Sequence, residues 1–144
     1  MQYTEWDPNP ETKAAAQALL DADDSDGINR ACGGRIAFGT AGLRGPMAAG
    51  YKNMNDLVIL QTVQGLCAYL KAQGVKSNRV IIGYDHRQRG SITSQNFARL
   101  SSAVFIRFGF EVILLDGSDA GIYAATPFVP FGIKQHDCCA GIMV

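Results

Sequence analysis

Apolar residues recur along the chain in two alternating patterns, a spacing of three or four residues and short continuous runs. Between about Asp56 and Ala72 they are three or four residues apart, which is the spacing of one face of an α-helix. The positions that set this spacing are Leu60, Val63, Cys67 and Leu70. Asn55 or Asn53 can cap the start of this predicted helix, and Gly74 follows its end.

Three shorter apolar runs have the length and β-branched content of buried strands. They are Val80–Ile82, Phe110–Leu115 and Cys138–Val144. A second long helix is predicted from about Ile92 to Phe108, between the first two runs. Thr126 followed by Pro127 predicts the start of a short helix before the third run. Strands that alternate with helices indicate an α/β architecture with a largely parallel sheet.

The first part of the chain predicts a separate short helix. Asn9 can cap it, Pro10 suits its first position, and apolar residues continue to Leu20. An acidic cluster follows, made of Asp21, Asp23, Asp24 and Asp26. Acidic side chains oppose the dipole at the end of a helix, so the cluster is interpreted as a solvated linker, with a cation site as the alternative.

Composition and charge exclude several classes of function. Thirteen basic residues balance thirteen acidic ones, which argues against nucleic-acid binding because such proteins carry a basic surplus. The first ten residues lack the apolar core of a secretory signal, and the apolar runs are too short for a membrane span. The four cysteines form no metal-binding spacing, so reduced and mostly buried thiols in a cytoplasmic protein are expected.

The segment from Phe38 to Gly45 is the best candidate for chemistry. Its glycines allow main-chain N–H groups to approach an anion closely, Thr40 adds a hydroxyl, and Arg44 supplies a guanidinium that matches phosphate oxygens in two-point fashion. The spacing is neither that of a dinucleotide-binding loop nor that of a Walker loop. Two interpretations stay open from the residues alone: a phosphate-binding loop, or a plain turn with Arg44 on the surface.

This segment, FGTAGLRG, closely resembles the signature of the α-D-phosphohexomutase superfamily. Further resemblances follow in the same order along the chain: Met54–Leu57, Asp85-x-Arg87, Phe97–Leu100, Thr126–Phe131 and Cys139–Met143. Glu5–Asp7 and Asn9–Pro10 are similar to the N-terminal extension of the eukaryotic phosphoglucomutase-2/phosphopentomutase branch. Several separate motifs in one order are far more specific than a single glycine loop.

The resemblance implies a fold and an activity for the intact protein. The fold is a three-layer α/β domain with a mixed, largely parallel sheet, in which residues 1–35 form an extension with a short helix and residues 36–144 form the first mutase domain. The activity is interconversion of sugar phosphates through a phosphoserine and a sugar bisphosphate, with Mg²⁺ bound. Carried over by position, Arg44, Thr40 and Gly42 would form the phosphate pocket, with Asp85 and Arg87 as supporting residues.

The resemblance also implies what this chain lacks. In the family the phosphoserine loop would follow Val144, so the domain is expected to be incomplete at its C-terminal end and inactive alone, without a catalytic nucleophile or metal ligand. The remaining mutase domains would be its partners. Two alternatives remain: a non-catalytic phosphate-binding module, and a structural or regulatory splice fragment. The preferred sugar phosphate is not indicated.

Overall fold

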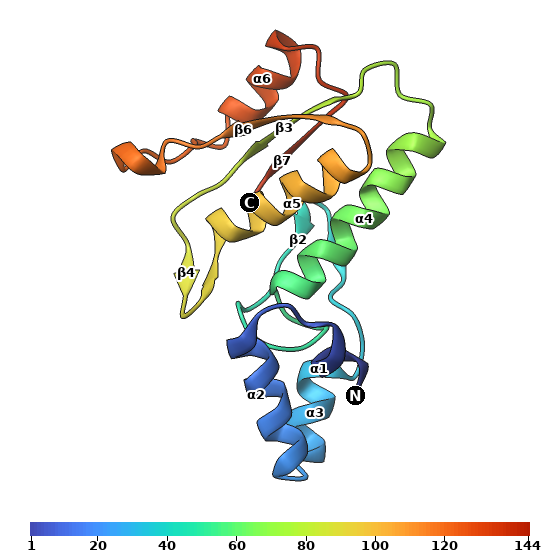
Figure 1. Ribbon diagram of the computed structural model, residues 1–144, viewed down its shortest axis with the longest axis vertical. Helices are drawn as coiled ribbons and strands as arrows, with labels where there is room; N and C mark the ends of the chain where they lie inside the picture. Colours follow the sequence, from blue (N-terminus) through green and yellow to red (C-terminus); the bar gives the residue numbers. More distant parts are fainter. The chain divides into compact units, whose positions relative to one another are not determined.

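A computed structural model describes residues 1–144 and divides the chain into two compact units. Residues 1–59 and 88–92 form the first unit, and residues 60–87 and 93–144 form the second. Figure 1 shows the elements of both units along the chain.

Three helices and a small hairpin make up most of the first unit. These elements are α1 (Gln2–Trp6), α2 (Pro10–Asp21), α3 (Ser25–Cys32), β1 (Phe38–Gly39) and β2 (Gly42–Leu43). The predicted cap of α2 is confirmed, because the Asn9 side chain accepts hydrogen bonds from the amides of Glu11 and Thr12. Tyr3, Ala16 and Leu57 form the buried apolar cluster of this unit.

The interpretation of the acidic cluster as a linker is partly wrong, because only residues 22–24 separate α2 from α3. Asp24 caps the N-terminus of α3, where its carboxylate accepts a hydrogen bond of 2.8 Å from the Gly27 amide. Asp26 lies in the first turn of the same helix. Carboxylates that oppose the end of one helix therefore stabilise the start of the next, since the N-terminus of a helix carries partial positive charge.

The predicted long helix is confirmed as α4 (Asp56–Ala72), and the structure decides between its two candidate caps. The Asn55 side chain is fully buried and accepts a hydrogen bond from the Val58 amide. Its amide group donates to the carbonyls of Ala48 and Gly50, at 2.8 Å each. Asn53 instead donates to the Ala49 carbonyl, so Asn55 is the cap.

The second unit contains a parallel sheet of three strands in the order β6–β3–β7. The strands are β3 (Arg79–Gly83), β6 (Glu111–Leu115) and β7 (Ala140–Met143), and all three predicted strands are confirmed. Both neighbours pair with β3 in parallel. Helices α5 (Ser94–Arg107) and α6 (Phe128–Gln135) lie on opposite sides of the sheet, which gives the expected three layers (Figure 1).

Alternation along β3 divides the core of the second unit between the two faces. Ile81 packs with Val129 of α6, and half-buried Ile133 and Met143 lie against them. Val80 and Ile82 are buried on the opposite face because successive strand side chains point to opposite sides. An edge-to-face pair, Phe105 and Phe110, lies where α5 leads into β6, with ring centroids 5.4 Å apart.

The order of the strands defines where the chain reverses the direction in which it moves across the sheet. The chain moves from β3 through α5 to β6 on one side, and then through α6 to β7 on the other side. The second crossover runs across the sheet in the opposite direction to the first and passes over the opposite face. The two crossovers therefore have the same hand, as expected because one hand is strongly preferred. The switch point lies between the carboxyl ends of β3 and β7, which is where open α/β sheets bind ligands.

Two predicted helix starts need correction. Helix α5 begins at Ser94 rather than near Ile92, because β5 (Ile92–Thr93) pairs with β4 (Gln88–Arg89) in a hairpin. The Thr93 hydroxyl then caps the helix by accepting from the Asn96 amide at 3.0 Å.

Thr126 does not cap α6. The N-cap position is Pro127, which offers no side-chain acceptor, so the proline shifts the helix start by one residue.

A short 3₁₀ turn, η1 (Ser118–Ala120), follows β6. None of the helices combines the length and the apolarity that crossing a lipid bilayer requires.

The cap of α4 generates a stability prediction. Asn55→Ala should lower the free energy of unfolding by about 2–4 kcal/mol, because it removes the cap and the side-chain hydrogen bonds to the carbonyls of Ala48 and Gly50. Asn53→Ala removes a single bond and should cost about 1 kcal/mol. Urea unfolding followed by circular dichroism measures both losses, and equal losses would contradict the assignment of the cap.

Candidate functional site

The segment that carries Arg44 folds as a tight hairpin. Strands β1 and β2 pair antiparallel, with Phe38 opposite Leu43 and Gly39 opposite Gly42. Thr40 is therefore at the exposed turn. Gly42 has a φ of 112°, a backbone angle that a residue with a Cβ adopts only under strain. The glycine thus permits the tight turn between β1 and β2, and Arg44 follows directly after β2 in the sequence.

Arg44 carries a charge that no acidic group of the chain compensates. Its side chain is exposed and makes neither a hydrogen bond nor an ion pair. The Thr40 hydroxyl is likewise exposed and without a hydrogen bond. An exposed arginine without an internal partner is suited to an anionic ligand such as a phosphate group.

Asp85 follows the carboxyl end of β3, and its carboxylate is held by several donors. The Arg87 guanidinium donates to it at 2.7 Å, the Arg87 amide at 3.0 Å and the Ser94 hydroxyl at 2.8 Å. Burial by itself raises the pKa of Asp85, but these hydrogen bonds and the Arg87 charge together hold it below its usual value. Asp85 is therefore ionised and rigidly oriented.

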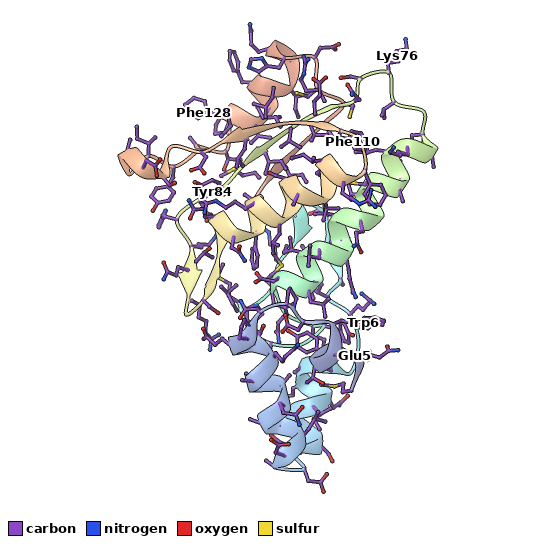
Figure 2. All side chains as sticks on the ribbon, in the orientation of Figure 1. Glu5, Trp6, Lys76, Tyr84, Phe110 and Phe128 are labelled. Carbon is purple, nitrogen blue, oxygen red and sulfur yellow. The ribbon has the colours of Figure 1, made fainter.

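A second carboxylate, Asp116, follows the carboxyl end of β6. It accepts hydrogen bonds from the hydroxyl of buried Tyr84 and from the amide and hydroxyl of Ser118. Hydrogen bonds from Tyr84 and Ser118, with a smaller one from Arg99, hold the pKa of Asp116 far below its usual range. Tyr84 lies at the end of β3 in Figure 2. This carboxylate was not assigned from the sequence, although its position after a parallel strand is a signal that could have found it.

The main chain joins β3 and β7 beyond their last paired residues. The Asp85 amide donates to the Val144 carbonyl at 2.9 Å, and the Val144 amide donates to the Gly83 carbonyl at the same distance. The end of β7 is thereby fixed next to Asp85 at the switch point. Asp85, Arg87 and Ser94 are brought together here in the second unit, whereas Arg44 and Thr40 belong to the first.

The chain offers no ligand set for a metal ion. No three His, Cys, Asp or Glu side chains are grouped so that they could hold one. Asp85 and Asp116 are each occupied by donors from their own loops. The residues of this chain therefore do not fit the Mg²⁺ that the resemblance implies for the intact protein.

All four cysteines are free thiols. Cys67 and Cys138 are buried, and Cys32 and Cys139 are half-buried. Burial raises the pKa of the Cys67 thiol to about 11, against the lowering effect of Lys71. A thiol with so high a pKa is a poor nucleophile near neutral pH, so Cys67 has a packing role.

Comparisons with known proteins agree with one family. Residues 35–144 match the family model described as phosphoglucomutase/phosphomannomutase, alpha/beta/alpha domain I. The chain is 41% identical to phosphopentomutase from Mus musculus and 35% identical to glucose 1,6-bisphosphate synthase from the same organism, over 99% of its length in both cases. It is 36% identical to phosphoribomutase from Saccharomyces cerevisiae over 96% of its length.

The matched regions are a small part of these relatives. The chain spans 23% of the length of the phosphopentomutase and of the glucose 1,6-bisphosphate synthase, and 21% of the phosphoribomutase. No solved structure matches the chain at a significant level.

The backbone at Gly42 generates a prediction for the hairpin. Gly42→Ala should lower the free energy of unfolding by about 1–2 kcal/mol, because alanine is strained at this φ even though the space around it is open. Gly65→Ala is the matched control: Gly65 lies exposed inside α4 with nothing within 4 Å, so alanine should stabilise by about 0.5–1 kcal/mol. Changes of the same sign in chemical denaturation would contradict the prediction.

The lowered pKa of Asp85 generates a prediction on pH. A group whose pKa is lower in the folded state contributes stability above its unfolded pKa, and this contribution is lost as the pH falls towards the folded value. Asp85→Asn should therefore lose less stability than the wild type between about pH 5 and pH 3. Ser94→Ala, which removes one donor, should show an intermediate dependence. Identical pH profiles of the unfolding free energy in all three proteins would refute the role of this carboxylate.

Proposed function

Because this chain belongs to the phosphoglucomutase/phosphomannomutase family, we propose that it supplies the phosphate-binding first part of a sugar-phosphate mutase. The intact protein would interconvert a sugar 1-phosphate with a 5- or 6-phosphate through a phosphoserine and a sugar bisphosphate. The similarity to phosphopentomutase, phosphoribomutase and glucose 1,6-bisphosphate synthase supports sugar phosphates as substrates and a bisphosphate as an intermediate.

The observation that carries this proposal is the uncompensated guanidinium of Arg44. The side chain is exposed and unpaired, and it follows a hairpin whose turn presents Thr40. Transfer of a phosphoryl group depends mainly on positioning and on charge stabilisation. We assign this role to Arg44, with Thr40 and Gly42 shaping the pocket beside it.

We place the nucleophile beyond Val144 rather than on a serine of this chain. The hydroxyls of Ser91, Ser94, Ser101, Ser102 and Ser118 already donate to acceptors within the chain. Residues that follow Val144 in a longer protein would leave β7 at the switch point, beside Asp85. In this proposal the chain alone is inactive, and Mg²⁺ would be bound by other parts of the protein.

The remaining features are compatible with this role and extend it. Four free thiols support a reducing compartment, and we propose the cytoplasm as the location. The balanced charge favours small phosphorylated substrates over nucleic acid as partners.

Substitution of Arg44 in the intact protein tests the proposal. Arg44→Lys should lower kcat/KM for sugar phosphates by about tenfold to a hundredfold, because lysine keeps the charge but loses the planar two-point fork. Arg30→Lys is the control, since Arg30 is exposed and makes only a 3.9 Å ion pair with Asp24. A coupled assay of mutase turnover measures both. Wild-type turnover in Arg44→Lys would remove Arg44 from the site.

A further inference from the structure

The tip of the β4–β5 hairpin is held by the start of α2, far away in the sequence. The Ser91 amide donates to a carboxylate oxygen of Glu11 at 2.7 Å, and the Ser91 hydroxyl donates to the Asn9 side-chain oxygen at 3.0 Å. These two bonds satisfy both donors of Ser91. A hydrogen bond to an ionised carboxylate is stronger than one between neutral groups, so Glu11 makes the stronger of the two contacts.

The hairpin turn is shaped to accept Glu11. Gly90 has a φ of 57°, and a Cβ at this position would lie 2.2 Å from a carboxylate oxygen of Glu11. Any other residue at position 90 would displace Glu11 from the Ser91 amide. The backbone conformation and the free space at Gly90 therefore both serve the same contact.

Asn9 is itself fixed in the first unit. It is buried, its side-chain oxygen also caps α2, and its side-chain amide donates to a carboxylate oxygen of buried Asp56 at 3.0 Å. Its main-chain amide donates to Asp7 at 3.1 Å. With every polar group of Asn9 in use, the point to which Ser91 is attached cannot move without breaking several buried hydrogen bonds.

The base of the same hairpin carries the residues at the end of β3. The Ser94 amide and hydroxyl donate to the Arg87 carbonyl at 3.0 and 3.3 Å, and the Ser94 hydroxyl also donates to Asp85. Ser91 lies four residues after Arg87 and three before Ser94. A single short segment is thus closed at its base by Ser94 and held at its tip by Glu11 and Asn9.

We infer that Glu11 and Asn9 are positioning residues that hold the tip of the β4–β5 hairpin at Ser91, in the stretch of chain that joins Arg87 to Ser94. The catalytic consequence rests on the proposed mutase function, whereas the anchoring itself does not. The N-terminal extension then has a defined task in the protein. It limits the motion of the turn between β4 and β5.

Amide hydrogen exchange in the 144-residue chain tests the anchoring. Glu11→Ala should increase the exchange rate of the Ser91 amide about threefold to tenfold, as expected for loss of one hydrogen bond, and should increase exchange at Ser94 to a smaller extent. The control is Glu5→Ala, an exposed acidic residue of α1 whose side chain makes no hydrogen bond. Unchanged exchange at Ser91 in Glu11→Ala, or an equal increase in Glu5→Ala, would overturn the inference.

Kinetics of the intact protein test the consequence for catalysis. Glu11→Ala should lower kcat on the order of tenfold with little change in KM, because the loop is misplaced rather than the substrate contact removed. Glu11→Gln keeps an oxygen acceptor for the Ser91 amide and should restore most of the loss. Faster exchange at Ser91 with wild-type kcat would overturn the positioning role and leave the mutase proposal intact. A wild-type protein without mutase activity would refute the proposed function, and the exchange measurement would then decide the anchoring alone.

Discussion

The parallel pairing of β3 with strands on both sides is the constraint on which the second unit depends. Its main chain hydrogen-bonds to β6 and to β7, and its side chains from Val80 to Ile82 are almost completely buried. Because both neighbours run in the same direction as β3, all three carboxyl ends meet at one edge of the sheet. That pairing fixes where the loops at this edge begin, whatever side chains the loops carry.

The carboxyl edge is a region of satisfied charge. Asp85 and Asp116 each accept several hydrogen bonds from their own loops, and both have lowered pKa values. Carboxylates held in this way orient the backbone of the loops rather than carry protons or metal ions. The edge is therefore a rigid frame, and its chemistry depends on what is brought to it.

The Arg44 hairpin has the opposite character. Its cation is exposed and has no partner, and its turn depends on a glycine at a backbone angle unsuited to other residues. Stability alone does not explain the cation, since an exposed arginine without a partner contributes little to folding. An anion bound beside the hairpin would account for this cation, which is why we propose Arg44, rather than the edge of the sheet, as the phosphate-binding residue.

Local signals in the sequence determined the helices, the strands and the family. The apolar spacing after Asn55 predicted α4, the β-branched runs predicted β3, β6 and β7, and the segment from Phe38 to Gly45 carried the resemblance. These features depend on residues that are close in sequence, so a single amino-acid sequence is enough to find them. The functional roles of Arg44, Thr40 and Gly42 stay predictions, because they depend on a ligand.

Tertiary structure decided what depends on which polar groups the folded chain pairs. The choice of Asn55 over Asn53 as a cap, the use of Asp24 to start α3, and the start of α5 at Ser94 rather than near Ile92 each follow from hydrogen bonds that spacing does not reveal. The contact between Glu11 and Ser91 joins residues 80 positions apart. Periodicity records which face of an element is apolar, but not which polar groups the fold will bring within hydrogen-bonding distance.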